Sequence, residues 1–538
     1  MIPSGHVDTF AREHLPPADQ WPEFLFELPA LQFAPRLNCA AELLDRAVER
    51  GWGARECVLG EGVRWSYSDL LDQANRIARV LVEDMGLKSG NRVLLRGANS
   101  PMLAACWFAV VKAGGIAVGS MPLLRARELT QIVQKGEISH ALCDQRLVDE
   151  LRAAQADCAS LRQLATFNDP GASDLEARAA GKPAEFTNAD TALDDVCLIA
   201  FTSGTTGQPK GTMHFHRDLL AACACWPPHV LRARADDRFI GSPPLAFTFG
   251  LGGLLLFPMS IGASTVLLER ATPDALPAAI ARYRASVCFT APTSYRAMTT
   301  SLGDHDLSSL RKCVSAGEAL PAATRSLWKQ ATGIELIDGI GSTELLHIFI
   351  SATEEQARGG ATGVPVPGYR ACVLDDEGRV LPPGQVGRLA VKGPTGCRYL
   401  ADDRQKTYVQ NGWNLTGDAY RIDDDGQFVF QARTDDMIIS GGYNIAGPEV
   451  ESALLLHPAV AECGVIGVAD DQRGQIVKAF VVPKPGVEPN DALVKTLQDF
   501  VKQTIAPYKY PRSIEFRTEL PRTETGKLQR FRLRQPGG

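Results

Sequence analysis

The spacing of apolar residues changes from that of a helix to that of a buried strand within the first hundred positions. From Ser68 to Glu83, apolar residues recur every three or four positions, which places them on one face of a helix. The segment Arg92–Arg96 then has a short continuous apolar run, typical of a buried strand. The helical face consists of Leu70, Ala74, Ile77 and Leu81.

Three further apolar runs predict buried strands farther along the chain. Strands that alternate with helices in this way favour an α/β architecture, built as a large composite body of layered sheets and helices. We expect this body to extend to about residue 430. The predicted strands are Val196–Phe201, Ser264–Leu268 and Ser286–Phe289.

The pattern changes after Arg433. Pro448 followed by Glu449 suits the start of a helix, because proline fits the first helical position and acids favour the positive helix terminus. The elements expected around this helix predict a small α+β domain of about 100 residues. They are strands at Met437–Ile439, Cys463–Val468, Lys478–Val482 and Ser513–Phe516, and a helix near Asp491–Thr504.

The length of the chain also requires more than one domain. It has 538 residues, whereas a single hydrophobic core stops growing near 250–300 residues, in round numbers. We expect a large N-terminal domain of residues 1–433 and a small, mobile C-terminal domain of residues 434–538. The hinge between them is placed at residues 434–436.

Charge and cysteine content exclude several classes of protein. The chain has 56 Lys and Arg against 62 Asp and Glu, a formal net charge of −6, so it lacks the basic footprint of a nucleic-acid-binding protein. Its thirteen cysteines are scattered singly, without the spacing of a disulfide framework, and the first residues do not have the pattern of a secretory signal. Both observations favour a cytoplasmic protein.

The two most apolar stretches are not good membrane spans. Pro101–Gly119 contains Lys112 and two glycines, and Leu251–Leu268 is interrupted by proline, serine and glycine. Neither is a clean apolar run of about 20 residues. Both are therefore interpreted as buried core, without membrane association.

A glycine-rich segment after one predicted strand is typical of a phosphate-binding loop. The segment Thr202–Gly211 reads TSGTTGQPKG. Its glycines allow backbone amides to approach an anion closely, its hydroxyl groups add donors, and Lys210 adds a positive charge. It is not a P-loop, because Pro209 precedes the lysine. The predicted polyphosphate site consists of Thr202, Ser203, Gly204, Thr205, Thr206, Gly207 and Lys210.

Four more motifs follow this loop. They are Gly341-Ser342-Thr343-Glu344, Thr416-Gly417-Asp418, Arg433-Thr434-Asp435-Asp436 and Pro521-Arg522-Thr523-Glu524-Thr525-Gly526-Lys527. In this order, and over nearly the whole chain, they resemble the adenylate-forming superfamily, which includes acyl-CoA synthetases, luciferases and peptide-synthetase adenylation domains.

The resemblance implies a role for each motif in binding ATP, Mg²⁺ and coenzyme A. Thr343 contacts the nucleotide phosphate and Glu344 holds Mg²⁺, while Lys527 is the catalytic lysine. Asp418 accepts both ribose hydroxyl groups, Arg433 reaches the ribose, and Asp435 is the pivot of the hinge. Other implied nucleotide-binding residues are Gly317, Glu318, Asp338 (beside the adenine amino group), Gly339, Ile340, Gly341 and Ser342, and the implied coenzyme A face is Gly441, Gly442 and Tyr443.

The chemistry that the resemblance implies has two steps. A carboxylate attacks the α-phosphate of ATP, which gives an acyl-adenylate and pyrophosphate, and a thiol then attacks the adenylate. Charge moves among the phosphate and carboxylate oxygens, so positioned cations and hydrogen-bond donors provide most of the catalysis. Lys527 bridges those oxygens in the first step, and rotation of the small domain withdraws it for the second. No cysteine is required as a nucleophile.

The segment around Phe247-Thr248 narrows the choice of acid. Amino-acid-activating relatives have aspartate after this phenylalanine, and without that carboxylate a buried ammonium group would be costly. This segment and the run through His347 resemble the benzoate-CoA ligase group, most closely its 2-aminobenzoate-CoA ligase members. Benzoate and hydroxybenzoates remain alternatives. The predicted pocket consists of Phe247, Thr248, Phe249, Ala316, Ile340 and His347.

Several alternatives stay open. Ile340 stands where many relatives have an aromatic residue beside the adenine. The acceptor is coenzyme A or, as the second possibility, a separate acyl-carrier protein, and the protein is expected to be a monomer or homodimer. A nucleotide-binding regulator on the same fold is the non-enzymatic alternative. A zinc site is a weaker hypothesis than helix packing for His214, His216, Cys223, Cys225 and His229.

Overall fold

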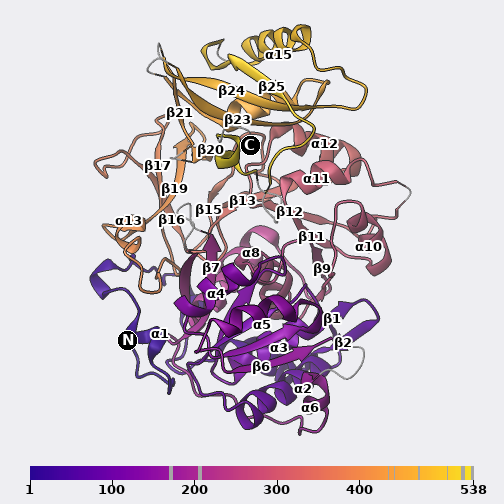
Figure 1. The fold of residues 1–538 in the computed structure, drawn as a ribbon, viewed down its shortest axis with the longest axis vertical. Helices are drawn as coiled ribbons and strands as arrows, with labels where there is room; N and C mark the ends of the chain where they lie inside the picture. Colours follow the sequence, from indigo (N-terminus) through magenta and orange to yellow (C-terminus); the bar gives the residue numbers. More distant parts are fainter. Residues whose placement is uncertain are drawn as a thin grey trace.

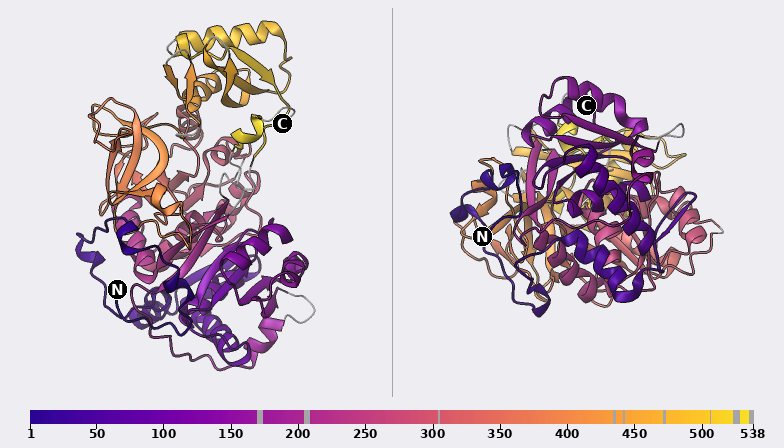
Figure 2. Two further views of the ribbon diagram at one scale, coloured as in Figure 1. Left: turned by 60° about the vertical axis from the view of Figure 1, so that its left-hand side comes forward. Right: turned by 90° about the horizontal axis from the view of Figure 1, so that it is seen from below.

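The computed structural model shows a large α/β body with a smaller domain at one end of its long axis (Figure 1). The structure describes residues 1–168, 174–203, 209–303, 305–433, 436–440, 443–470, 473–505, 507–522 and 528–534. In the left view of Figure 2, the C-terminal domain stands at the top, far from the N-terminal part of the chain.

A six-stranded sheet forms the N-terminal part of the body, in the order β6-β5-β3-β4-β7-β8. All neighbouring strands are parallel except β7 and β8, which form an antiparallel pair. The strands are β3 (Arg92–Arg96), β4 (Ile116–Ser120), β5 (His140–Asp144), β6 (Gln163–Phe167), β7 (Val196–Ser203) and β8 (Pro209–Phe215). The predictions for β3 and for the start of β7 are confirmed.

Along the chain, five α-helices alternate with the strands of this sheet, and a short helix, α1 (Phe10–Glu13), precedes them. The first of the five confirms the helix predicted from the apolar face, which is buried. Its start is fixed because the Ser66 hydroxyl accepts a hydrogen bond from the Asp69 amide and the Asp69 carboxylate accepts one from the Ser66 amide. The five are α2 (Tyr67–Arg79), α3 (Pro101–Lys112), α4 (Ala126–Lys135), α5 (Val148–Ala156) and α6 (Asp174–Ala180).

A nine-stranded sheet forms the second layer, in the order β15-β14-β13-β12-β11-β9-β10-β1-β2. Its central strands run parallel, as in an α/β fold. The strands are β1 (Glu56–Gly60), β2 (Val63–Ser66), β9 (Arg238–Gly241), β10 (Ser264–Val266), β11 (Val287–Thr290), β12 (Lys312–Ala316), β13 (Leu336–Gly341), β14 (Ile348–Ser351) and β15 (Val364–Pro365). The helices between them are α7 (His216–Trp226), α8 (Thr248–Leu251), α9 (Phe257–Ile261), α10 (Ala275–Tyr283), α11 (Pro292–Met298) and α12 (Ala322–Thr332).

A third sheet of the body is entirely antiparallel and was not predicted. It lies to one side of the body, coloured orange in the left view of Figure 2. Its elements are β16 (Arg370–Leu374), β17 (Gly387–Lys392), α13 (Gln405–Tyr408), β18 (Val409–Gln410), β19 (Trp413–Ile422) and β20 (Phe428–Arg433).

The smaller domain has its own sheet and its own hydrophobic core. The strand order is β22-β21-β24-β23, with β25 beside β24. The strands are β21 (Ile438–Ser440), β22 (Tyr443–Ile445), β23 (Val460–Asp470), β24 (Gly474–Pro483) and β25 (Ser513–Phe516), and the helices are α14 (Gly447–Leu455), α15 (Asp491–Thr504) and α16 (Arg530–Leu533). The predicted α+β character is confirmed, as are the bounds of α15 and β25.

The two most apolar stretches are buried inside the body. The first forms α3 and β4, and the second forms α8, α9 and β10 with a π-helical segment, Gly252–Leu256, between the helices. Within the described ranges, no helix combines the length and the apolar character needed to cross a bilayer.

Candidate active site

A cleft of about 1350 Å³ lies between the body and the smaller domain. Both parts contribute to its walls, which include residues of β13, β19 and β20 on one side and of α14 on the other. Most of the nucleotide-site residues predicted from sequence and described by the structure lie on these walls. They are Lys210, Gly317, Glu318, Asp338, Gly339, Ile340, Gly341, Ser342, Glu344, Asp418 and Arg433.

The glycine-rich segment connects β7 to β8. These strands pair up to their ends, with Thr202 opposite Lys210 and Ser203 opposite Pro209. β7 and β8 therefore form a hairpin, and Lys210 places this end of β8 on the cleft wall. The predicted phosphate-binding residues Gly204, Thr205, Thr206 and Gly207 lie outside the described residues.

The motif Gly341-Ser342-Thr343-Glu344 ends β13 and enters a tight turn. His214 lies with Nε2 2.8 Å from the Thr343 carbonyl oxygen, and the Thr395 hydroxyl donates to the Leu345 carbonyl at 2.7 Å. Leu346 has a φ of 71°, an unfavourable value for a residue with a side chain. The two hydrogen bonds hold the turn in this conformation on both sides of Glu344.

The Glu344 side chain is fixed separately from the backbone of the turn. The Tyr399 hydroxyl donates a hydrogen bond of 2.6 Å to Glu344 Oε1, and Lys210 Nζ lies 3.4 Å from the same hydroxyl oxygen. Burial, reinforced by the Glu344 carboxylate, raises the pKa of Tyr399, so the phenol keeps its proton for this bond. Tyr399 was not among the predicted site residues, because its segment has no strand or helix periodicity. A tyrosine that is buried nonetheless needs a partner for its hydroxyl.

Asp418 and Arg433 face each other across neighbouring strands. They are Cα partners on β19 and β20, and Arg433 Nη1 donates to Asp418 Oδ1 at 3.0 Å and to the Thr416 carbonyl at 3.1 Å. Gly417 has a φ of 76°, which favours glycine, and a Cβ atom there would lie 2.8 Å from Arg433 Nη2 and would displace the guanidinium. Burial raises the pKa of Asp418, while the Arg433 charge opposes this shift.

Asp338 has an unpaired acceptor in the cleft wall. It lies on β13 and is 7% exposed, and its Oδ1 has no hydrogen-bond partner. Burial raises its pKa to about 7. A buried acceptor without a partner fits a ligand that brings an N–H donor.

The residues predicted for the acid pocket do not share one open cavity. Ile340 lines the large cleft, whereas Phe247 and Thr248 line a separate apolar hollow of about 20 Å³, too small for an aromatic ring. Ala316 is the last residue of β12 and lies opposite Gly339. Phe249 and His347 contact each other, with ring centroids 5.6 Å apart.

His347 sits in an aromatic enclosure. Its ring centroid lies 4.4 Å from that of Phe257 and 5.9 Å from that of Trp226. Its Nε2 lies 3.3 Å from the Phe249 carbonyl oxygen, whereas the buried Nδ1 has no partner. Burial lowers the pKa of His347 to about 3, so the ring is neutral at physiological pH. With Nε2 donating to Phe249, Nδ1 is a free acceptor.

Some predicted residues of the small domain lie outside the described residues: Asp435, Gly441, Gly442 and Lys527. Tyr443 begins β22, with its backbone opposite Ser440. Arg522 and Leu528, on either side of the segment that contains Lys527, form an antiparallel bridge, and both line the cleft. The base of that segment is therefore held at the cleft.

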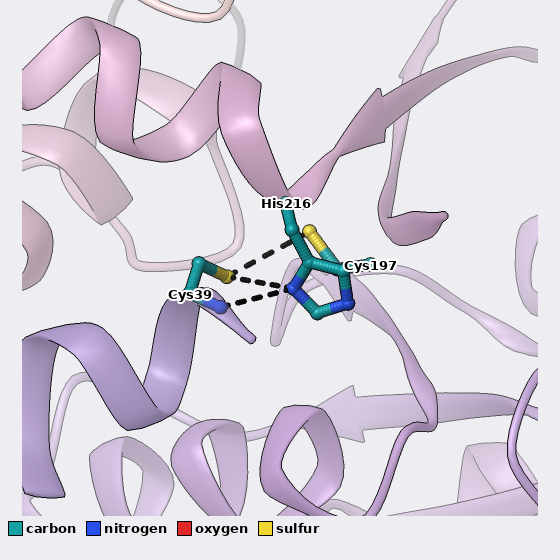
Figure 3. Close-up of side chains that lie close together, drawn as sticks. All are labelled: Cys39, Cys197 and His216. Carbon is teal, nitrogen blue, oxygen red and sulfur yellow. Dashed lines mark hydrogen bonds between the residues drawn. The ribbon is translucent and has the colours of Figure 1, made fainter. Parts of the chain in front are cut away.

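The residues of the weaker zinc hypothesis do not converge. His214 bonds to Thr343, and His216 instead lies beside Cys39 and Cys197 (Figure 3). Cys39 Sγ lies 3.9 Å from Cys197 Sγ and 3.3 Å from His216 Nδ1, and the Cys39 amide donates to that nitrogen at 3.1 Å. Because this amide uses the Nδ1 lone pair, we interpret the cluster as hydrogen-bonded packing.

Comparisons with known proteins agree with this fold and cleft. Residues 44–399 match the family model described as AMP-binding enzyme, and residues 449–527 match that of its C-terminal domain. The benzoate–CoA ligase of Thauera aromatica is 34% identical over 515 residues, which cover 94% of this chain and 97% of the relative. The 4-hydroxybenzoate–CoA/benzoate–CoA ligase of Rhodopseudomonas palustris is 32% identical over 520 residues, covering 93% and 94%.

One solved structure is similar to this chain in both sequence and fold. The anthranilate CoA ligase AuaEII, in complex with anthranoyl-AMP, superposes with a TM-score of 0.90 at 35% identity, covering 94% of this chain and 98% of that one. Fold, cleft and relatives together define an AMP-forming acid–CoA ligase, a class that uses ATP and coenzyme A. The chain belongs to the AMP-binding enzyme family, within its benzoate–CoA ligase group.

Proposed function

We propose that the protein is an aryl-CoA ligase that activates an aromatic carboxylate, with 2-aminobenzoate as the preferred acid. The reaction consumes ATP, forms an aryl-adenylate and passes the aryl group to coenzyme A, releasing pyrophosphate and AMP. The observation that carries this proposal is the convergence of Lys210, Asp338, Glu344, Asp418 and Arg433 on one cleft between the two domains.

In the proposed nucleotide site, the carboxylates of this cleft accept hydrogen bonds from the adenine and the ribose, and its lysine lies at the phosphates. The unpaired Asp338 Oδ1 accepts from the adenine amino group, Asp418 accepts from the ribose hydroxyls, and Arg433 supports Asp418 from the opposite strand. Lys210, at the end of the β7–β8 hairpin, faces the phosphates. Preorganised groups of this kind stabilise charge that develops during phosphoryl chemistry.

Magnesium fits the same site. Glu344 lines the cleft, and the described residues give its Oε2 no hydrogen bond, while Oε1 is occupied by Tyr399. A carboxylate oxygen is a ligand that Mg²⁺ prefers in nucleotide sites. We assign Glu344 as the metal ligand, with Thr343 beside the phosphates. When bound, the ion neutralises phosphate charge.

The small domain is proposed to bring Lys527 to the reacting groups. The limits remain those predicted, residues 1–433 and 434–538, with a hinge at 434–436 that includes Asp435. The strands on either side of the hinge belong to separate sheets, since β20 ends at Arg433 and β21 begins at Ile438. Rotation about this point would exchange Lys527 for the face containing Gly441, Gly442 and Tyr443.

The choice of 2-aminobenzoate depends on His347. Its neutral ring has a free acceptor at Nδ1, which suits the N–H of an ortho amino group, and an aromatic amine is uncharged at physiological pH. Phe249 and Ile340 offer apolar contact to the ring of the acid, and Thr248, between Phe247 and Phe249, adds a hydroxyl group. The anthranilate CoA ligase with a TM-score of 0.90 supports the same substrate.

A panel of acids tests the proposal. The purified protein is incubated with ATP, Mg²⁺ and coenzyme A, and AMP and the thioester are measured for 2-aminobenzoate, benzoate, the three hydroxybenzoates, hexanoate and phenylalanine. We expect the highest kcat/KM for 2-aminobenzoate. Turnover of hexanoate with none of the benzoates would overturn the substrate class. Adenylate formation with transfer only to an added acyl-carrier protein would replace coenzyme A as acceptor.

A further inference from the structure

Tyr399 occupies its place because its segment pairs with β8. The Met213 amide donates to the Arg398 carbonyl at 2.8 Å, and the Leu400 amide donates to the Gly211 carbonyl at 2.8 Å. Tyr399 itself bridges to Thr212 and is 1% exposed. The strand that contains Lys210, β8, therefore also holds the phenol that reaches Glu344.

The hydrogen bonds around this phenol have a fixed direction. A carboxylate only accepts and an ammonium group only donates, so Lys210 donates to the phenol oxygen and the phenol donates to Glu344 Oε1. Bonds of this kind to charged groups are stronger than neutral ones. The phenol proton thus bonds to Oε1 of Glu344, and this bond fixes the orientation of the carboxylate in the cleft.

We propose that Tyr399 is a positioning residue for the metal ligand. It occupies Glu344 Oε1 so that Oε2 is directed to Mg²⁺, and it links that carboxylate to Lys210. The inference rests on the proposed function, since it assumes that the cleft binds ATP with Mg²⁺. Tyr399 acts through Glu344 and does not itself contact substrate.

The fold of the turn does not depend on this hydrogen bond. The backbone on both sides of Glu344 is already held by His214 at Thr343 and by Thr395 at Leu345. Removing the phenol oxygen should therefore leave the turn in place and release only the carboxylate. This separates a positioning role from a structural one.

The test is Tyr399→Phe, with ATP binding measured by calorimetry in Mg²⁺ and in EDTA, without acid. We expect the gain in ATP affinity that Mg²⁺ provides to fall by about 10- to 100-fold, the range for a lost hydrogen bond to a charged group. Affinity in EDTA should stay within about 2-fold. The matched control is Tyr67→Phe, which also removes a buried hydroxyl, 2.7 Å from the Ala263 carbonyl oxygen, at a residue that does not line the cleft.

Two results would overturn the inference. One is an unchanged Mg²⁺-dependent gain in Tyr399→Phe, and the other is an equal loss of affinity in Mg²⁺ and in EDTA. Glu344→Gln provides a second measurement, because Tyr399→Phe should then have no additional effect on the gain, and additive losses would contradict action through Glu344. A wild-type protein whose ATP binding is indifferent to Mg²⁺, or which adenylates none of the acids, would instead reject the proposed function.

Discussion

Arg522 of the smaller domain lies 3.6 Å from Glu318 of the body, measured from Nη1 to Oε1. The same guanidinium donates to Glu462 Oε2 at 2.8 Å, within its own domain. Glu318 follows β12 and accepts a hydrogen bond from the Thr293 hydroxyl. This ion pair therefore joins the base of the Lys527 segment to the wall of the cleft that we propose binds the nucleotide.

Arg522→Gln should change the balance between the two half-reactions. A partly exposed ion pair contributes up to about 1 kcal/mol, so we expect the ratio of the adenylation rate to the thioesterification rate to change by about 2- to 5-fold. Single-turnover adenylation and the reaction of supplied aryl-adenylate with coenzyme A measure the two rates. Arg517→Gln is the control, because Arg517 pairs with Glu515 inside the small domain. Equal changes of both rates in Arg522→Gln would contradict a link to domain arrangement.

Lys527→Ala should change the ratio of the adenylation rate to the thioesterification rate far more than Arg522→Gln does. The proposed lysine stabilises charge only while the adenylate forms, so adenylation should fall by about 10²–10³-fold or more, the range for a lost stabilising donor. Thioesterification of supplied adenylate should stay within about 10-fold of wild type.

The matched control is Lys502→Ala, which removes a lysine that pairs with Asp499 on the same helix. This variant should retain both activities. An equal loss of both half-reactions in Lys527→Ala would remove the lysine from its proposed role.

The sequence predicted elements well where local pattern decides them. The bounds of β3, α15 and β25 agree with the predicted ones because each is a short apolar run or an amphipathic segment with clear ends. The third sheet of the body, β16 to β20, was missed, since its strands alternate with polar residues and are held by antiparallel neighbours. The fold class followed from the order of elements and from motif resemblance.

From sequence alone, residues of the candidate site could be proposed only where a motif contains them. Tyr399 is the clearest omission, because its bond to Glu344 joins residues 55 positions apart and depends on pairing between its segment and β8. No local signal encodes that contact. The contacts of His347 with the aromatic rings of Trp226, Phe249 and Phe257 likewise depend on tertiary packing.

Asp338→Asn should change how stability depends on pH. Burial raises the pKa of Asp338 to about 7 in the folded protein, whereas an aspartate in the unfolded chain titrates near pH 4, in round numbers. The folded state therefore binds this proton more tightly, and the stabilising contribution is fully present below pH 4 and is lost as the pH rises to 7. Asparagine has no such loss.

The measurement is the difference in Tm between Asp338→Asn and wild type at pH 4.5 and at pH 8. We expect the variant to gain a few degrees on wild type between these values, because the shifted carboxyl is worth at most about 4 kcal/mol. Glu355→Gln is a control for an exposed carboxyl, whose pKa is lowered to about 2 through hydrogen bonds to Thr353 and Arg232. A constant Tm difference between Asp338→Asn and wild type would contradict the raised pKa.

Gly252→Ala should disturb the acid pocket through His347. A Cβ atom at residue 252 would lie 2.4 Å from His347 Cδ2, closer than such atoms can approach. The imidazole has little room to move, since Phe257 lies 4.4 Å away between ring centroids. Overpacking of this kind costs about 1–3 kcal/mol, so Tm should fall. The ratio of kcat/KM for 2-aminobenzoate to that for benzoate should fall as well, because the Nδ1 acceptor is displaced.

Gly181→Ala is the control, since a Cβ atom there would meet only the Arg178 carbonyl oxygen, at 3.7 Å. If Gly252→Ala binds ATP normally and keeps the wild-type ratio of the two acids, His347 does not recognise the ortho substituent.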